Sequence, residues 1–286
     1  MVPLEYCRQK VATRDSSFHY CTLFLPPEKR DVLTVLYAYY CEVSEIIDEC
    51  SEPAVARIKL EWWRQEIARL FDGSPSHPVA KALHPIIQSY PLAAEQLLEV
   101  IEAVDADIEQ PLYNTAEELA SYCRRVGTFY HLLLARTLGY TDTTTGDYAR
   151  ELGAAFRFTQ IIRDVGKDAQ RGRTYIPMED LQRFDVPPTN IVNRIDDPNI
   201  AALIAFEIRR AKGFYNDALD RLSEQDRLQQ LPGLLMAAVY RATLDEIERD
   251  GCQVLKHRIT LSPIRKRWIA WKTRRNEVRR ARQRNH

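Results

Sequence analysis

The chain has 286 residues, of which 45% are hydrophobic, enough for a substantial core in one large domain or two ordinary ones. Its 40 basic residues balance its 40 acidic residues, so the formal net charge is zero. The first residues carry scattered charges, and no window holds about 18 uncharged apolar residues, so we expect neither a signal peptide nor a membrane span. The six cysteines lack the paired spacing of a metal site and suit a reducing compartment, which favours a cytoplasmic protein.

Helical periodicity recurs along the chain, and the presence of only 10 glycines and few β-branched runs favours helices over strands. The predicted helices span residues 30–50, 60–71, 78–90, 92–108, 115–138, 144–168, 198–223 and 228–250. Thr115 is expected to cap one of them, because its hydroxyl can accept from first-turn amides. Residues 169–197 hold several prolines and are expected to form a loop. We therefore predict one all-α domain over residues 1–264, followed by a basic tail over residues 265–286.

The most informative helix is predicted over residues 144–168, because polar side chains interrupt its apolar stripe. The polar residues of this face, spaced 3, 4 and 4 apart, are Arg157, Gln160, Asp164 and Asp168. Phenylalanine, isoleucine and valine lie between them, which indicates that much of the helix is buried. Two carboxylates one turn apart in an apolar setting repel each other unless a cation lies with them. The pattern therefore predicts a divalent cation that holds a phosphate.

A second acidic face is predicted on the helix over residues 30–50. Its members are Cys41, Ser44, Glu45 and Asp48, with Glu49 at the edge. Acids at this spacing commonly form a solvated helix face, but Glu45 and Asp48 are close enough to bind one cation together. If the two acidic faces oppose each other across a cavity, they bracket a metal–diphosphate cluster. Departure of diphosphate needs such cations, because they neutralise the charge that develops as the carbon–oxygen bond breaks.

Nine different short motifs are distributed along nearly the whole chain. They are Ser16-Ser-Phe18, Leu25-Pro-Pro27, the acidic helix Tyr37–Glu49, Leu60-Glu-Trp-Trp-Arg64, Tyr122-Cys-Arg-Arg-Val126, Arg163-Asp-Val-Gly-Lys-Asp168, Arg171-Gly-Arg-Thr-Tyr-Ile-Pro177, Glu179-Asp-Leu181 and Ala238-Val-Tyr-Arg241. Together they resemble the squalene/phytoene synthase family, the head-to-head isoprenoid synthases. The run from Arg163 to Pro177 is specific for this family, and its residues are most similar to those of presqualene diphosphate synthases.

The resemblance implies an isoprenoid-synthase-type helical bundle around one central cavity, with two prenyl diphosphates, farnesyl or geranylgeranyl, as substrates. It also implies a three-metal Mg²⁺–diphosphate cluster and a cyclopropyl diphosphate intermediate, whereas NADPH is not expected. The residues that match metal ligands are Glu45, Asp48, Glu49, Asp164 and Asp168. Catalytic positions match Asp48, Asp164, Asp168, Arg173 and Tyr175. Substrate-binding positions match Phe18, Tyr37, Arg157, Gln160, Arg171 and Tyr240, with core packing as the alternative for the tyrosines.

The first acidic motif departs from the family pattern R-x-x-D-D-x-x-D-E. Cys41 replaces the arginine, Ser44 the leading aspartate and Glu45 the second aspartate. Further departures are Arg157 and Gln160 in place of Gln and Asn, and Thr128 and His131 in place of glycines. The bulkier side chains at the last two positions are expected to narrow the space for a prenyl chain.

Two interpretations of Arg157 follow. In the first, its guanidinium supplies the positive charge that position 41 has lost, the carboxylates still bind metal, and prenyl transfer survives. Capture of the allylic cation by water would instead make the protein a prenyl diphosphate hydrolase. In the second, Arg157 pairs with Glu45 or Asp164 in the place of a cation, and metal affinity collapses. The chain would then resemble non-catalytic relatives that act as assembly or interaction factors for a respiratory complex.

The tail over residues 265–286 concentrates positive charge. It holds ten Lys or Arg residues and one acid, Glu277, together with Trp268 and Trp271. A solvated helix is one interpretation, and contact with anionic lipid headgroups or with nucleic acid are the others. Because indole prefers the membrane interface, we expect peripheral membrane contact rather than nucleic-acid binding. The sequence makes no prediction of the oligomeric state.

Overall fold

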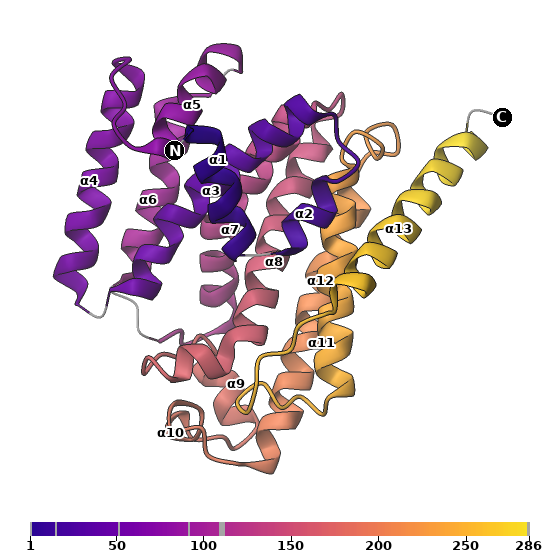
Figure 1. The fold of residues 1–286 in the computed structure, drawn as a ribbon. Coiled ribbons are helices and arrows are strands. Elements are labelled where there is room, and N and C mark those ends of the chain that lie inside the picture. The colour runs from indigo at the N-terminus through magenta and orange to yellow at the C-terminus, as the bar shows by residue number, and fades with distance from the viewer. Residues whose placement is uncertain (1, 15, 51, 91, 109–111, 285–286) are drawn as a thin grey trace. The chain divides into compact units, whose positions relative to one another are not determined.

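The computed structural model describes residues 2–14, 16–50, 52–90, 92–108 and 112–284, and within these ranges the side chains of residues 13, 14, 16 and 48 lie outside the description. Every regular element in these ranges is a helix, from α1 to α13 (Figure 1), which confirms the all-α prediction. None of the helices in the described ranges combines the length and the apolar composition that crossing a bilayer requires. The chain forms two compact units.

The first unit comprises Met1–Glu109 and Leu133–Gly139. Its helices are α1 (Pro3–Arg14), α2 (Ser16–Thr22), α3 (Pro27–Glu49), α4 (Pro53–Phe71), α5 (Pro78–Ser89) and α6 (Ala94–Ile108). Helix α3 contacts α1, α4, α5 and α6, because its apolar stripe, including Leu33 and Leu36, is buried among them. The buried hydroxyl of Tyr39 donates to the Leu97 carbonyl of α6 at 2.7 Å. Because the apolar stripe of α3 is buried in this packing, the polar side chains of α3 lie on its other sides.

Helix α4 begins at Pro53 rather than at the predicted residue 60. A proline fits the first helical turn, because the amide hydrogen that it lacks has no partner there in any case. Among residues 53–59 only Ala56 is buried, so the apolar periodicity that reveals a helix is absent from this turn.

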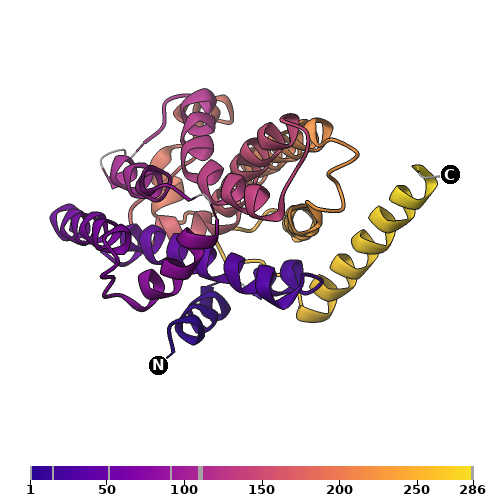
Figure 2. The ribbon, with the colours of Figure 1, turned by 90° about the horizontal axis from the view of Figure 1, so that it is seen from above.

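The second unit comprises Gln110–Leu132 and Tyr140–His286. Its helices are α7 (Ala116–Leu138, whose last turns belong to the first unit), α8 (Thr144–Ala169), α9 (Met178–Arg183), α10 (Pro188–Val192), α11 (Pro198–Arg221), α12 (Leu231–Arg249) and α13 (Pro263–Arg284). Thr115 caps α7 as predicted, since its hydroxyl accepts from the Glu118 amide at 3.2 Å. Helices α8, α11 and α12 pack side by side (Figures 1 and 2), and α8 is buried along most of its length.

The predicted loop over residues 169–197 contains the two short helices α9 and α10. Each begins directly after a proline, Pro177 or Pro187, and each is anchored by one buried apolar side chain, Leu181 or Ile191. A helix of fewer than about two turns presents too few apolar positions for its periodicity to be recognised in the sequence.

Helices α7 and α8 touch through their backbones at a pair of glycines. A Cβ atom added to Gly127 would lie 2.2 Å from the carbonyl oxygen of Gly153, and one added to Gly153 would lie 2.1 Å from that of Gly127. Such distances are far inside van der Waals contact, so only glycine permits this approach. The crossing fixes the position of α8, which carries half of the predicted site residues of this unit.

His131 lies beside this crossing in the core of the second unit. Its Nδ1 donates to the Gly127 carbonyl at 2.9 Å, and its ring packs against that of Phe156 at a centroid distance of 4.7 Å. Burial lowers the pKa of His131 from 6.5 to about 4, because removal from water disfavours the imidazolium ion, and the Gly127 carbonyl offsets only part of this effect.

This burial predicts a loss of stability in acid. A histidine whose pKa is depressed on folding contributes stability in full above its unfolded pKa of 6.5, and the contribution is lost as the pH falls from 6.5 through about 4. Between pH 6.5 and 5 we expect His131 to lower the free energy of unfolding by about 2 kcal/mol, measured by urea denaturation. His131→Asn keeps a donor for Gly127 and should remove this slope, whereas His19→Asn, at an exposed position, should keep it. Equal slopes in the wild type and the His131 variant would contradict the assignment.

Candidate active site

Asp164 of α8 is held ionised by two arginines. Arg163 donates to its two carboxylate oxygens at 3.1 and 2.7 Å, and Arg258 donates through Nε to Oδ1 at 2.5 Å. Burial favours a higher pKa for Asp164, but the charges and hydrogen bonds of Arg163 and Arg258 outweigh it and hold the pKa well below its usual value of 3.8. The Asp164 side chain is 17% exposed, so a ligand can reach it.

Arg258 reaches Asp164 because Gly166 lets its chain segment lie against α8. A Cβ atom on Gly166 would lie 2.5 Å from the Val254 carbonyl oxygen, so any other residue would push this segment away. The guanidinium of Arg194 also holds the segment, with donors 2.9 and 2.7 Å from the Leu255 carbonyl oxygen. The glycine of the Arg163–Asp168 motif therefore has a packing role. No sequence signal identifies Arg258, which lies 94 residues from Asp164 in a segment without periodicity.

The end of α8 forms a tight turn that presents Arg171 and Arg173. The amides of both residues donate to the Asp168 carbonyl, at 2.9 and 3.1 Å. Gly172 between them has a φ of +70°, a left-handed conformation that glycine adopts without strain. Arg171 is exposed, whereas Asp168 and Arg173 are half-buried. The predicted residues Asp168, Arg171 and Arg173 are thus brought together at the end of the helix that carries Asp164.

Arg157 lies against a cluster of tyrosine rings. Its Nη2 donates to the hydroxyl of Tyr122 at 2.5 Å, and its guanidinium carbon lies 5.3 Å from the centroid of that ring and 5.4 Å from that of Tyr175. The rings of Tyr113, Tyr122 and Tyr175 lie 5.3 to 6.1 Å apart. Aromatic faces attract a guanidinium through their quadrupole, so these contacts hold a positive charge in the second unit. Tyr113 was not predicted, since nothing near it in the sequence distinguishes it from a core residue.

Gln160 and Tyr240 are neighbours in the same unit. The Gln160 amide donates to the Tyr240 hydroxyl at 3.5 Å, and the buried Tyr240 ring packs against Phe156 at a centroid distance of 4.9 Å. Two predicted substrate-binding residues from α8 and α12 therefore meet. The role of Tyr240 in substrate binding stays a prediction, with core packing as the alternative.

In the first unit, the acidic side chains of α3 meet a lysine. The ammonium group of Lys10 in α1 lies 2.6 Å from the Glu45 carboxylate and 3.3 Å from that of Glu42. Cys41 is fully buried and the Ser44 hydroxyl donates to its carbonyl at 3.4 Å. The predicted ligand Asp48 has a side chain outside the described ones, and the role of Glu45 as a metal ligand stays a prediction. The Lys10 ammonium group therefore lies beside the acidic motif of α3, in which Cys41 stands where the family pattern has an arginine.

Phe18 and Tyr37 form an apolar stack in the first unit. Their rings are nearly parallel, 7° apart, with a centroid distance of 4.6 Å, and both side chains are buried. Two predicted substrate-binding residues from α2 and α3 are thus in contact, and their assignment to a substrate surface stays a prediction.

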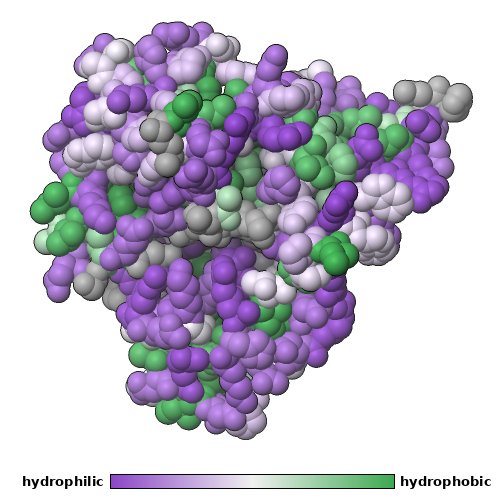
Figure 3. All heavy atoms as spheres, viewed as in Figure 1, coloured by the Kyte–Doolittle hydropathy of each residue, from purple (hydrophilic) through white to green (hydrophobic). Residues whose placement is uncertain are grey.

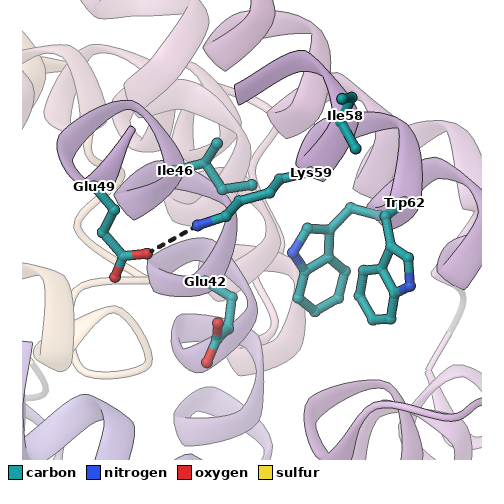
Figure 4. Close-up of a pocket in the computed structure, with 7 residues that line it drawn as sticks. Glu42, Ile46, Glu49, Ile58, Lys59 and Trp62 are labelled. Carbon is teal, nitrogen blue, oxygen red and sulfur yellow. Dashed lines mark hydrogen bonds and ion pairs between the residues drawn. The ribbon is translucent and has the colours of Figure 1, made fainter. Parts of the chain in front are cut away.

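A different side of α3 lines a pocket of about 370 Å³ together with α4. Its lining residues are Glu42, Ile46, Glu49, Ile58, Lys59, Trp62 and Trp63. Figure 4 shows Lys59 reaching Glu49 at one side of the pocket, with the Trp62 indole at the other, and the Lys59–Glu49 distance is 3.5 Å. At about 100° per residue, Glu42, Ile46 and Glu49 point away from the side that carries Cys41 and Ser44. Glu49, predicted as an edge ligand, therefore lies in this pocket.

The donor set of α8 suits Mg²⁺, which binds carboxylate oxygens and commonly takes only one or two carboxylates, with water and phosphate oxygens as its other ligands. Asp164 is ionised, and Asp168 follows one helical turn later. Within the described ranges, no three His, Cys, Asp or Glu side chains gather as a metal cluster. Asp164 and Asp168 are the carboxylates of α8 that would hold such an ion, which would share its remaining ligands with a bound diphosphate and replace the contacts of Arg163 and Arg258 with Asp164.

The chain matches known proteins over most of its length. A model of the squalene/phytoene synthase family matches residues 11–265. The 15-cis-phytoene synthase of Synechocystis is 30% identical over 267 residues, which cover 89% of this chain and 79% of that protein. The phytoene synthase of Mycobacterium tuberculosis is 31% identical over 262 residues, which cover 90% of this chain and 86% of that protein.

Solved structures agree with these matches. A dehydrosqualene synthase in complex with ligand has a TM-score of 0.83 at 23% identity and covers 96% of both chains, which confirms the predicted isoprenoid-synthase-type fold. A squalene synthase from Alicyclobacillus acidocaldarius has a TM-score of 0.74 at 26% identity, covering 87% of this chain and 94% of that one. Since the family model spans most of the sequence, the chain belongs to the squalene/phytoene synthase family.

Proposed function

We propose that this protein condenses two prenyl diphosphates, farnesyl or geranylgeranyl, head to head through a cyclopropyl diphosphate. The observation that carries the proposal is the end of α8, where Asp164 is followed one turn later by Asp168 and by a turn that holds Arg171 and Arg173. The relatives named phytoene synthase, about 30% identical over nine tenths of the chain, support the same substrate class.

In this proposal, Asp164 and Asp168 of the second unit hold Mg²⁺, whose other ligands are water and diphosphate oxygens, and the metal-binding roles of Glu45, Asp48 and Glu49 in the first unit stay predictions. When bound, Mg²⁺ neutralises the charge that develops on diphosphate as the carbon–oxygen bond breaks. Arg171 and Arg173 bind diphosphate oxygens, since a guanidinium donates two parallel hydrogen bonds to such groups. Arg157, which lies on the faces of the Tyr122 and Tyr175 rings, adds a third positive charge for the diphosphate in the same unit.

The direct test is incubation of the purified protein with farnesyl or geranylgeranyl diphosphate and Mg²⁺, followed by mass spectrometry of the extracted products. We expect a condensed product with the carbon atoms of two substrate molecules, as the cyclopropyl diphosphate or a hydrocarbon formed from it. The free prenyl alcohol alone would identify a hydrolase instead. Absence of turnover, together with no Mg²⁺-dependent thermal stabilisation by a non-hydrolysable prenyl diphosphate analogue, would reject both activities.

A second candidate is a non-catalytic assembly or interaction factor for a respiratory complex. It is favoured by one observation, that basic side chains already neutralise the acidic groups, with Arg163 and Arg258 on Asp164 and Lys10 on Glu45. A protein of this kind would bind neither Mg²⁺ nor diphosphate, and tagged protein would recover a respiratory subunit from cell extracts.

Arg258→Gln separates the two candidates. The variant removes one of the two positive charges that compete for Asp164, the exposed one, so in an enzyme we expect Mg²⁺-dependent binding of inorganic diphosphate to tighten by up to about five-fold, measured by calorimetry. Lys256→Gln is the matched control, because it removes one charge from the same segment but lies by Asp196. If neither variant nor the wild type binds diphosphate with Mg²⁺, the non-catalytic candidate is favoured.

A further inference from the structure

One side of α13 is fastened to the second unit by ion pairs and apolar contacts. The pairs include Arg265 with Glu246 at 2.5 Å, Arg227 with Glu277 at 2.7 Å, and Arg280 with Glu224. Ile269 and Ala270 are buried on the same side, and Figure 1 shows α13 starting beside α12. The only acid of the helix, Glu277, is therefore turned inward, and its carboxylate is 12% exposed.

The opposite side begins with three large apolar or aromatic residues. Ile264 is 84% exposed, Trp268 54% and Trp271 48%. Their spacing of four and three residues places them on one face of the helix. Exposed tryptophans beside an exposed isoleucine are unusual in water, because burial of such side chains is favourable by about 1.5–3 kcal/mol each.

The same face continues as a row of arginines. Arg275, Arg279 and Arg282 follow Trp271 at intervals of four, four and three residues, and all three are exposed. The guanidinium of Arg275 lies 5.3 Å from the ring of Trp271, and the ammonium of Lys272 lies 4.9 Å from that of Trp268. Figure 3 shows mostly hydrophilic residues over the C-terminal part of this helix, at the upper right of the view. The aromatic and cationic groups thus form one continuous surface rather than separate patches.

We propose that this surface, the α13 face, formed by Ile264, Trp268, Trp271, Arg275, Arg279 and Arg282, binds a bilayer surface that contains anionic lipids. Indole rings prefer the headgroup region, and arginines beside it pair with lipid phosphates. Ile264 and the tryptophans would leave water on binding, which contact with phosphate alone does not achieve. Inward pairing of Glu277 with Arg227 removes the one acid that would repel such a surface. The proposal is independent of catalysis.

The test uses the full chain and sedimentation with vesicles of phosphatidylcholine that contain about one third phosphatidylglycerol. We expect binding that weakens with salt and is absent with pure phosphatidylcholine. In the variant Arg275→Gln/Arg279→Gln, we expect the partition coefficient to fall about 25-fold, since each arginine near an anionic surface contributes about five-fold. The matched control, Arg209→Gln/Arg221→Gln, removes two exposed arginines from α11 and should bind as the wild type does.

The variant Trp268→Ser/Trp271→Ser tests the apolar part without changing charge. We expect weaker binding and loss of the fluorescence quenching that lipids with brominated chains cause, although Trp62 and Trp63 remain. Unchanged melting temperatures show that the variants are folded. Wild-type vesicle binding by both α13 variants, an equal loss in the α11 control, or binding to RNA without binding to vesicles would each overturn the proposal.

Discussion

Asp164→Asn is expected to lower kcat/KM for prenyl diphosphate condensation by about a hundred- to a thousand-fold, the loss typical when one group that stabilises developing charge is removed. Asp164 is ionised in the folded protein, whereas asparagine is neutral and offers one weak oxygen ligand. The measurement is product formation with farnesyl or geranylgeranyl diphosphate over a range of Mg²⁺ concentrations. Higher Mg²⁺ should restore part of the rate, because the variant weakens metal binding.

Asp147→Asn is the matched control for this substitution. Asp147 lies on the same helix, is 52% exposed and pairs with Arg150 at 2.7 Å, so its loss should leave turnover unchanged. Asp147→Asn should melt close to the wild type, whereas Asp164→Asn should melt lower, because it removes the carboxylate that pairs with Arg163 and Arg258. Circular dichroism at the assay temperature checks that both variants are folded. If Asp164→Asn turns over at the wild-type rate, the carboxylate has no part in the chemistry and the proposed function loses its main support.

Gly127→Ala is expected to destabilise the protein by about 3 kcal/mol or more. The added methyl group would lie 2.2 Å from the carbonyl oxygen of Gly153 and 2.8 Å from the amide nitrogen of Ala154. These atoms belong to helix backbone and cannot rotate away as a side chain does, so α7 and α8 have to separate. Chemical denaturation measures the change in the free energy of unfolding.

Gly213→Ala provides the control for helix propensity. Gly213 lies within α11, and a Cβ atom there would meet nothing within 4 Å, so the same substitution should stabilise the protein by up to about 1 kcal/mol. The two substitutions are identical in chemistry and opposite in expected sign. A stabilised Gly127 variant would show that α7 and α8 do not meet through their backbones.

The helical architecture and the positions of the candidate groups along it could be predicted from the amino-acid sequence. Periodicity located the long helices, and Thr115 marked the start of α7, because both depend on contacts within one or two turns. The spacing of Asp164 and Asp168 likewise followed from helix geometry. Tertiary contacts were needed where the local pattern is weak, as in the first turn of α4 and in α9 and α10.

The pairing of charges with carboxylates, in contrast, depends on contacts between distant parts of the chain. Arg258 meets Asp164 across 94 residues, and Lys10 meets Glu45 from another helix. The guanidinium of Arg157 was expected either to serve a diphosphate or to pair with a carboxylate, and the structure adds its contacts with Tyr122 and Tyr175. A guanidinium is attracted to carboxylates and to aromatic faces alike, so residue type and spacing do not distinguish these partners. Packing does, through close approaches such as that of Gly166 to Val254.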